Sequence, residues 1–248
     1  MAGLCLKTVT LVFFLSAGSL AAVDQNTLAV DQNTLAANQD TLAGLILAVK
    51  DRYLIKGMFS LALSIQSKNQ NLEQIFKDNP VNKVTDQLSK GLVYRGKRLA
   101  VAKVKKPEHA ELRLLTNLSL VSKKGDLLVI YSYASSCSTS CTVINGPYNI
   151  IKKINNVIDK GNWSKYAFVF EKVFSPKNKT HIEKCFLRKA LKDLGTSRIT
   201  LANIFRCYVP NKANSSFQCT SCSSDGGVTE ACIDYEQECL KECCRIES

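Results

Sequence analysis

Four residues in the middle of the chain carry side chains that could bind a metal ion and move protons. His109 and Glu111 stand at the start of an apolar helical pattern, and Cys137 and Cys141 follow an apolar, strand-like run. One imidazole and two thiolates can hold Zn²⁺ and leave a fourth coordination position for water. Zinc lowers the pKa of a bound water toward about 7, and Glu111 can carry the released proton without being a ligand. These residues therefore predict a zinc site that activates water, with Glu111 as the catalytic proton carrier.

Each of these residues also has an alternative role. The two cysteines could form a disulfide if the chain is exported, and His109 and Glu111 could be a surface pair at a helix start. The second histidine, His181, precedes another helical pattern and has no candidate ligand nearby. We therefore expect His109, and not His181, to bind a metal.

Basic and aromatic residues near the four could contact a substrate. Lys105 and Lys106 precede the histidine, and Tyr131 and Tyr133 end the strand-like run before the cysteines. Lysines suit a phosphate-bearing substrate and a tyrosine can stack on a base. Basic residues are more often a solvated face, however, and strand aromatics are more often core. These four residues are therefore secondary candidates for substrate binding.

The elements that must position these side chains follow from the hydrophobic pattern. Strands are expected over residues 58–65, 98–104, 126–133, 166–173 and 198–205. Helices are expected over residues 71–89 with a break at Pro80, from Pro107 through Leu118, from near Cys137 through Ile158, and over residues 181–194. This order predicts a three-layer α-β-α sandwich around a five-stranded mixed sheet. The last two strands should be parallel because a helix joins them. Both metal-site helices should start at one edge of the sheet.

Both ends of the chain differ from this central α/β region. Residues 1–22 are typical of a secretory signal, with an apolar core too short to be a stable membrane anchor. Residues 23–49 hold heptapeptide repeats, which favour a disordered or loosely helical spacer over a self-associating helix. The catalytic-type domain is expected over residues 50–206, followed by a cysteine-rich tail over residues 207–248. The chain is therefore expected to be secreted and extracellular.

The cysteines and the sequons agree with export. The chain has eleven cysteines, and eight remain when Cys5 leaves with the signal peptide and the two candidate ligands are set aside. An even remainder suits disulfides, although a structural zinc bound by tail cysteines such as Cys219 and Cys222 is an alternative. The sequons make Asn162, Asn178 and Asn214 candidates for glycosylation. A fourth, at Asn117, is the least expected because it falls late in a predicted helix.

The overall charge favours a polyanionic partner. The formal net charge is +12, with a sequence pI of about 9.2. Nucleic acid, an anionic membrane surface and acidic glycans would all be attracted to such a chain. Charge therefore narrows the class of partner without selecting one.

The order of elements resembles that of the cytidine deaminase fold, and more narrowly its AID/APOBEC-like branch. The resemblance covers roughly residues 50–205 and rests on the His-Ala-Glu at 109–111 and on the run of residues 131–137 that ends at a cysteine. Together with the signal peptide and the cysteine-rich tail, it points to secreted AID/APOBEC-like deaminases of lower vertebrates. The resemblance implies zinc bound by His109, Cys137 and Cys141, and proton transfer by Glu111. Two departures are Ser136 in place of the family's proline and three residues, instead of two, between the cysteines.

Three functions are open at this point. The first is a secreted zinc-dependent deaminase that converts cytosine to uracil in single-stranded DNA or RNA, with a role in defence against foreign nucleic acid. The second is a secreted binding protein that keeps the fold without the reaction, a reading that Ser136 and the cysteine spacing motivate. The third is an extracellular enzyme that acts on free cytidine.

Overall fold

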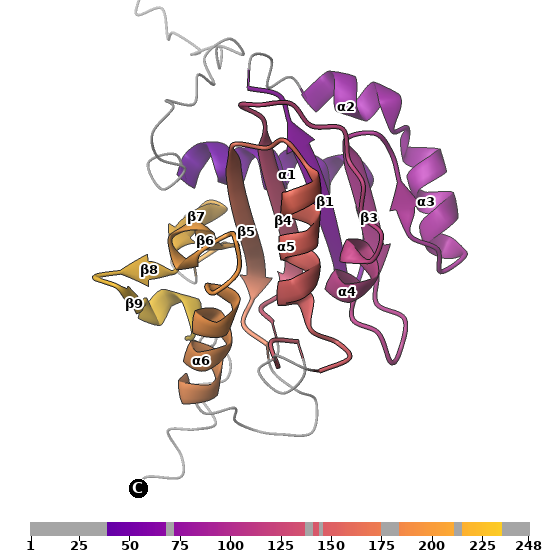
Figure 1. The fold of residues 1–248 in the computed structure, drawn as a ribbon. Helices are drawn as coiled ribbons and strands as arrows, with labels where there is room; N and C mark the ends of the chain where they lie inside the picture. The colour runs from indigo at the N-terminus through magenta and orange to yellow at the C-terminus, as the bar shows by residue number, and fades with distance from the viewer. Residues whose placement is uncertain are drawn as a thin grey trace, which may run out of the picture.

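A seven-stranded mixed sheet forms the centre of the computed structural model, which describes residues 39–67, 72–136, 141–143, 146–174, 184–210 and 215–234. The strand order is β2-β3-β1-β4-β5-β6-β7 (Figure 1). The strands are β1 Phe59–Ile65, β2 Tyr94–Arg95, β3 Leu99–Lys103, β4 Leu127–Ala134, β5 Lys165–Lys172, β6 Ile204–Tyr208 and β7 Gln218–Ser221. β4, β5 and β6 run parallel, and the remaining pairs in this sheet are antiparallel. We call the edge where β4 and β5 finish the carboxyl end of the sheet, and the edge where they begin the amino end.

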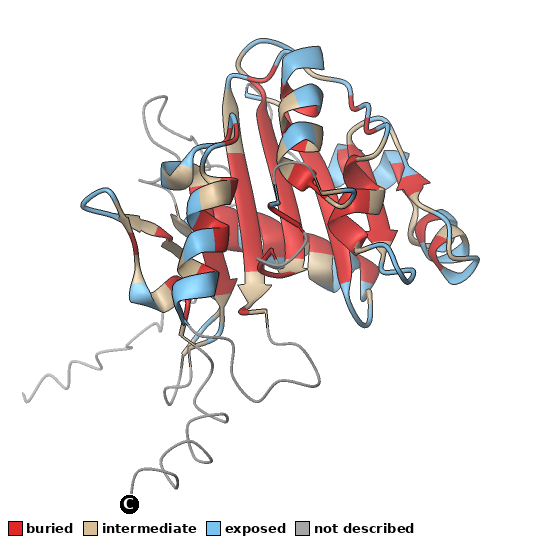
Figure 2. Cartoon of the chain, turned by 60° about the horizontal axis from the view of Figure 1, so that its bottom comes forward, coloured by how far each residue is buried: buried red, intermediate tan, exposed pale blue. Residues whose placement is uncertain are grey.

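Helices cover both faces of this sheet. One apolar core joins the sheet to α4 Ala110–Leu115, α5 Ile150–Lys160 and α6 Lys184–Leu194. The opposite core joins it to α1 Gln39–Tyr53, α2 Leu72–Asp78 and α3 Val81–Ser89. Figure 2 shows the buried strands between helices whose outer sides are exposed. The expected three-layer α/β sandwich is therefore confirmed.

β4 shows how the sheet separates the two cores. Leu128 and Ile130 pack with α4 and α5, whereas Val129 and Tyr131 pack with α1. Successive side chains of a strand point to opposite faces, so a strand covered on both sides is apolar at almost every position. Ser132 shares the alternation of Leu128 and Ile130 and is also buried. A polar side chain is thereby placed beneath α4.

The sheet has seven strands rather than the expected five. β2 is only two residues long, too short to leave a hydrophobic pattern. β7 lies in a polar, cysteine-rich stretch that was expected to lie outside the sheet, but it pairs antiparallel with β6. The last parallel strand also starts later than expected, because the 3₁₀ turn Leu201–Asn203 precedes it. The predicted parallel pairing of β5 and β6 is confirmed.

Two helices also begin later than their patterns predicted. Residues 105–108 form a turn closed by a bridge between Lys105 and Glu108, so α4 starts at Ala110 and not at Pro107. α5 starts at Ile150 and not near Cys137, because Asn149 caps it. The predicted break at Pro80 is confirmed, since Pro80 separates α2 from α3.

The helix α1 lies inside the region for which a spacer was expected. It begins within the third heptapeptide and buries Ile46, Val49 and Tyr53 against the sheet. Lys50 on the same helix forms an ion pair with Glu171 of β5. Residues 39–49, which were assigned to the spacer, therefore belong to a helix that packs on the sheet. The earlier heptapeptides lie outside the described residues.

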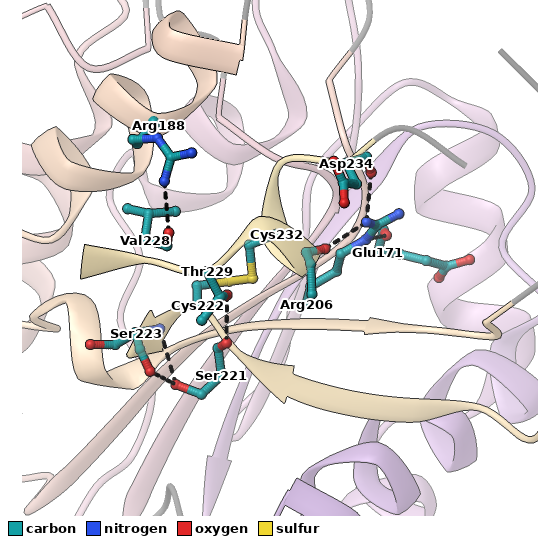
Figure 3. The surroundings of a disulfide bond; sticks show 11 residues. Glu171, Arg188, Arg206, Ser221, Cys222, Ser223, Val228, Thr229, Cys232 and Asp234 are labelled. Carbon is teal, nitrogen blue, oxygen red and sulfur yellow. Dashed lines mark hydrogen bonds between the residues drawn. A yellow bond between two sulfur atoms is a disulfide. The ribbon is translucent and has the colours of Figure 1, made fainter. Parts of the chain in front are cut away.

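Two disulfides secure the segment after β6. Cys207–Cys219 joins β6 to β7, and Cys222–Cys232 closes the short hairpin of β8 Ser223–Ser224 and β9 Gly227–Val228 (Figure 3). The expected disulfide-tied tail is therefore confirmed for these four cysteines. The alternative of a zinc site that uses Cys219 and Cys222 does not hold in this structure.

Arg206 fixes the end of this segment to the sheet. The side chain of Arg206 on β6 is buried, and its Nη1 donates hydrogen bonds to the carbonyl oxygens of Ala231, at 2.7 Å, and Asp234, at 2.8 Å. Its Nε donates to the carbonyl oxygen of Glu171 at 3.3 Å. Figure 3 shows the guanidinium between β5 and the turn that carries Cys232. A buried charge with this many partners ties the C-terminal segment to the central strands.

Candidate active site

The short helix α4 presents His109 and Glu111 at the carboxyl end of the sheet. His109 is the N-cap residue, with extended backbone angles and no side-chain capping bond. Arg113 anchors this helix by donating to the carbonyl oxygens of Lys103, at 2.5 Å, and Gly91, at 2.6 Å. The imidazole is therefore held at a fixed position without being used to cap the helix.

Arg95 closes the other end of α4. Its guanidinium donates to the carbonyl oxygens of Thr116, at 2.6 Å, and of Leu114 and Asn117, at 3.4 Å. These carbonyls have no partner within the helix, and a cation at a helix C-terminus satisfies them. Burial lowers the pKa of Arg95 without discharging it, because the usual pKa of arginine exceeds 12. Hydrogen bonds from Arg113 and Arg95 thus hold the six-residue helix α4 in place.

His109 and Cys141 meet although they are 32 positions apart in the sequence. The His109 Nδ1 and Cys141 Sγ atoms are 3.2 Å apart. A tetrahedral zinc ion with Zn–N and Zn–S distances of about 2.0 and 2.3 Å would hold two such atoms about 3.5 Å apart. Cys141 is 2% exposed and carries a thiol rather than half of a disulfide. The pair therefore fits two ligands of a zinc site, and the alternative disulfide is not present in this structure.

The start of α5 holds Cys141 in place. The Asn149 side chain accepts hydrogen bonds from the backbone N–H groups of Ile151, at 2.8 Å, and Lys152, at 3.3 Å, and so caps the helix. The Ile150 N–H donates to the carbonyl oxygen of Cys141 at 2.9 Å. The cysteine is therefore fixed to the helix that packs beside α4.

Glu111, two residues after His109, is buried in the first turn of α4. Its side chain is on α4, the residue is 8% exposed, and its Oε1 accepts a hydrogen bond of 2.6 Å from the Ser132 hydroxyl on β4. A buried carboxylate oriented by a hydroxyl from the sheet can accept and return a proton at a defined place. The geometry therefore agrees with the proton-carrying role expected for Glu111.

Two buried hydroxyl groups flank the expected thiolate ligands. The Ser136 and Thr142 side-chain oxygens have no hydrogen-bond partner among the described residues. Ser136 directly precedes Cys137, and Thr142 directly follows Cys141. Buried hydroxyls normally find a partner. A hydroxyl beside a metal-bound thiolate can donate to the sulfur, so these two groups are compatible with a metal at this site.

The third expected ligand, Cys137, lies outside the described residues. Within the described ranges, no group of three or more His, Cys, Asp or Glu side chains is arranged to hold a metal ion. The structure thus brings His109 and Cys141 together, and Glu111 lies two residues after His109 on α4. The complete ligand set stays a prediction.

Tyr131 and Tyr133 lie on the opposite face of the sheet from this site. Tyr131 is fully buried in the core beneath α1, and its hydroxyl donates to Glu171 at 2.8 Å. Burial, followed by the charge of Glu171, raises the pKa of the Tyr131 hydroxyl far above its usual range. Tyr133 packs against the same core. The suggestion that one of these tyrosines contacts a substrate beside the zinc site is therefore wrong, because the alternation of β4 turns both away from α4.

Lys105 and Lys106 lie where the sequence placed them, in the exposed turn that leads into α4. They precede His109 and therefore lie at the carboxyl end of the sheet. Lys123 and Lys124, which are also exposed, lie at the amino end instead, since they come just before β4. The first pair keeps its candidate role in substrate binding.

The sequence analysis missed two residues that build the site. Asn149 stands directly before the apolar series of α5, and an Asn at that position is a helix-start signal that could have placed the helix correctly. Ser132 gave no such signal, because both faces of β4 are covered and its pattern does not reveal which face meets α4.

A family model described as "Secreted Novel AID/APOBEC-like Deaminase 1" matches residues 39–236 of this chain. The matched region includes α1, both disulfides and all the described residues of the site. No curated protein and no solved structure matches the chain.

Proposed function

Because the chain belongs to the family of secreted AID/APOBEC-like deaminases, we propose that it is a zinc-dependent hydrolase that converts cytosine to uracil. The observation that carries this proposal is the meeting of His109 with Cys141, beside a buried and oriented Glu111. A surface pair at a helix start would require neither the burial of Glu111 and Cys141 nor the approach of the imidazole to the thiol. Cys137 is proposed as the third ligand.

Zinc bound by these residues would supply a water of lowered pKa at neutral pH. Glu111 would take one proton from water and deliver it to N3 of the cytosine ring. The oxygen of water would add at C4 as a hydroxyl, and Glu111 would then take the second proton from this hydroxyl and give it to the amino group. The C4–N bond would break, and the amino group would leave as ammonia. Ser132 keeps the carboxylate aimed at the reacting atoms during both transfers.

The substrate that we propose is single-stranded DNA or RNA rather than free cytidine. A net charge of +12 and the exposed Lys105 and Lys106 next to the site favour a phosphate backbone. A secreted enzyme of this kind would act on foreign nucleic acid, so a defence role follows from the compartment and the chemistry. Residues 1–22 are proposed as the signal peptide. No helix in the described part of the chain is long and apolar enough to cross a membrane.

A catalytically inactive binding protein is the second candidate. Ser136 replaces the proline of the family pattern, and three residues instead of two separate the cysteines. Both changes fall on the segment that would supply the two thiolate ligands. A protein that kept the fold but lost zinc would still present the basic turn at Lys105 and Lys106.

The experiment that tests the proposal is a deamination assay of the secreted protein on single-stranded oligonucleotides and on cytidine, beside a Glu111→Gln variant. We expect uracil in the oligonucleotide and a loss of product of at least about 100-fold in the variant, the usual contribution of a general acid or base. Product from cytidine alone would support the nucleoside enzyme. No product from either substrate by a zinc-loaded protein would support the binding protein.

A further inference from the structure

Two asparagines at the amino end of the sheet have both the sequence context and the exposure that N-glycosylation requires. Asn117 is followed by Leu118 and Ser119, and Asn162 by Trp163 and Ser164. Both asparagines are exposed, as are the two serines that complete the sequons. We propose that Asn117 and Asn162 both carry N-linked glycans.

Asn117 lies beyond the helix in which its sequence pattern had placed it. α4 ends at Leu115, and Asn117 adopts a left-handed backbone with a φ of 56°, a conformation that asparagine tolerates better than most residues. Its carbonyl oxygen faces Arg95, as part of the capping of α4, while the residue itself is exposed. The reason for ranking this sequon last, its position inside a helix, therefore does not apply.

Asn162 lies in the connection between α5 and β5. Its backbone N–H donates to the Ser122 hydroxyl at 2.8 Å, which fixes the turn at the surface. The following Trp163 turns inward and donates to the Ser64 hydroxyl at 2.9 Å. The sequon is thus anchored by its middle residue while Asn162 faces the solvent.

The two asparagines lie at the opposite end of the sheet from the candidate active site. α4 runs from His109 at the carboxyl end toward Asn117, and Asn162 directly precedes the first residues of β5. Cys141 meets His109 at the far end of the same helix. Glycans at Asn117 and Asn162 would therefore cover the amino end and leave the approach to His109 open.

The disulfides place the chain in the compartment where this modification occurs. Cys207–Cys219 and Cys222–Cys232 are typical of proteins that fold in the secretory pathway. In the modification, Nδ2 of the asparagine forms a bond to the anomeric carbon of an oligosaccharide. The bond from that carbon to a lipid diphosphate breaks, and Nδ2 gives up one proton.

The test is glycopeptide mass spectrometry of the full chain secreted from an animal cell line, before and after enzymatic glycan removal, which leaves Asp at each modified Asn. We expect Asp at both positions, and the loss of one glycan in the variants Asn117→Gln and Ser119→Ala alike. Two different substitutions guard against a folding defect in either. Asn82→Gln is the matched control, because Asn82 is exposed but not in a sequon.

The proposal would be overturned if Asn117 were unmodified in secreted protein that carries a glycan elsewhere. It would also be overturned if the Asn117→Gln and Ser119→Ala variants both carried the same glycan mass as the parent. The metal content of these two variants should equal that of the parent, since the glycan lies at the other end of α4. A fall in metal content with an intact fold would overturn the inferred separation of the glycans from the site.

Discussion

At the residue scale, the contact between Glu111 and Ser132 sets the direction in which the carboxylate can act. The Ser132 hydroxyl donates to Oε1 of Glu111 at 2.6 Å and so restricts the orientation of the carboxylate. A 1 Å error in the position of a catalytic group can cost about 100-fold in rate. Ser132 is therefore a positioning residue for Glu111.

Replacement of Ser132 by Ala should lower kcat by about 10- to 100-fold with little change in KM, because Glu111 loses its orientation while substrate contacts remain. Steady-state kinetics and zinc analysis check this, with zinc content expected to stay constant. Ser60→Ala is the matched control. Ser60 pairs with Ser132 across β1 and β4, is equally buried, and has no hydrogen-bond partner among the described residues. Equal losses in both variants would argue against a specific role for Ser132.

How much of this site could be predicted from the sequence differs from residue to residue. His109 and Glu111 follow from their spacing and from the apolar helix that they open, and the structure places Cys141 against the imidazole. The tyrosines of β4 were misplaced because an alternating pattern does not say which side of a doubly covered strand faces the site. Ser132 was missed for the same reason.

At the element scale, α1 is part of the helical layer on one face of the sheet, although its first residues belong to the heptapeptide repeats. Only residues 39–42 of α1 belong to a heptapeptide. Ile46 and Val49 follow the repeat in a stretch that was assigned to the spacer, and both are fully buried against the sheet. Packing on the sheet, and not the local sequence pattern, accounts for this helix, because a helix of this length gains most of its stability from tertiary contacts. The family match also begins at residue 39, where α1 begins.

Replacement of Ile46 by Ala should lower the free energy of unfolding by about 2–5 kcal/mol, the usual cost of such a truncation in a packed core. Leu47→Ala is the control, since Leu47 is 40% exposed on the same helix and should cost less than about 1 kcal/mol. Urea unfolding of both variants provides the comparison. Equal and small effects would show that α1 is not part of the stable core.

At the scale of the whole molecule, the C-terminal segment completes the domain. Ion pairs of Glu230 with Lys184 and Arg188 join α6 to this segment, and the Arg188 and Lys184 side chains lower the pKa of Glu230. Because the pKa of Glu230 is lower in the folded state than in the unfolded state, its carboxylate stabilises the fold at pH values above its unfolded-state pKa. This stabilisation is lost as the pH falls through the folded-state pKa. The effect is small at an exposed site. The disulfides and Arg206 carry the larger part of the attachment.

Removal of the Cys222–Cys232 bridge, as the double variant Cys222→Ala and Cys232→Ala, should lower the free energy of unfolding by about 2–4 kcal/mol, because a closed loop loses its restriction of the unfolded chain. Denaturant titration of the secreted variant measures this loss. An unchanged midpoint would mean that the hairpin contributes nothing to the stability of the domain.

The distribution of charge over the molecule predicts how it meets nucleic acid. Lys105→Ala with Lys106→Ala should weaken binding to single-stranded DNA and reduce the slope of log K against log salt by about 1–1.5, as expected for two lost phosphate contacts. Lys123→Ala with Lys124→Ala removes the same charge at the other end of the sheet and should leave this slope nearly unchanged. Equal slopes for the two double variants would indicate non-specific attraction by the net charge alone.

The metal content of the secreted protein tests the central claim most directly. We expect about one zinc ion per chain in the parent, and its loss in His109→Ala and in Cys141→Ser. Cys185→Ser is the matched control and should keep the metal, because Cys185 is an exposed thiol on α6, outside the site. A parent without zinc, or a Cys141→Ser variant that retains it, would contradict the proposed site and favour a non-catalytic relative of the deaminases.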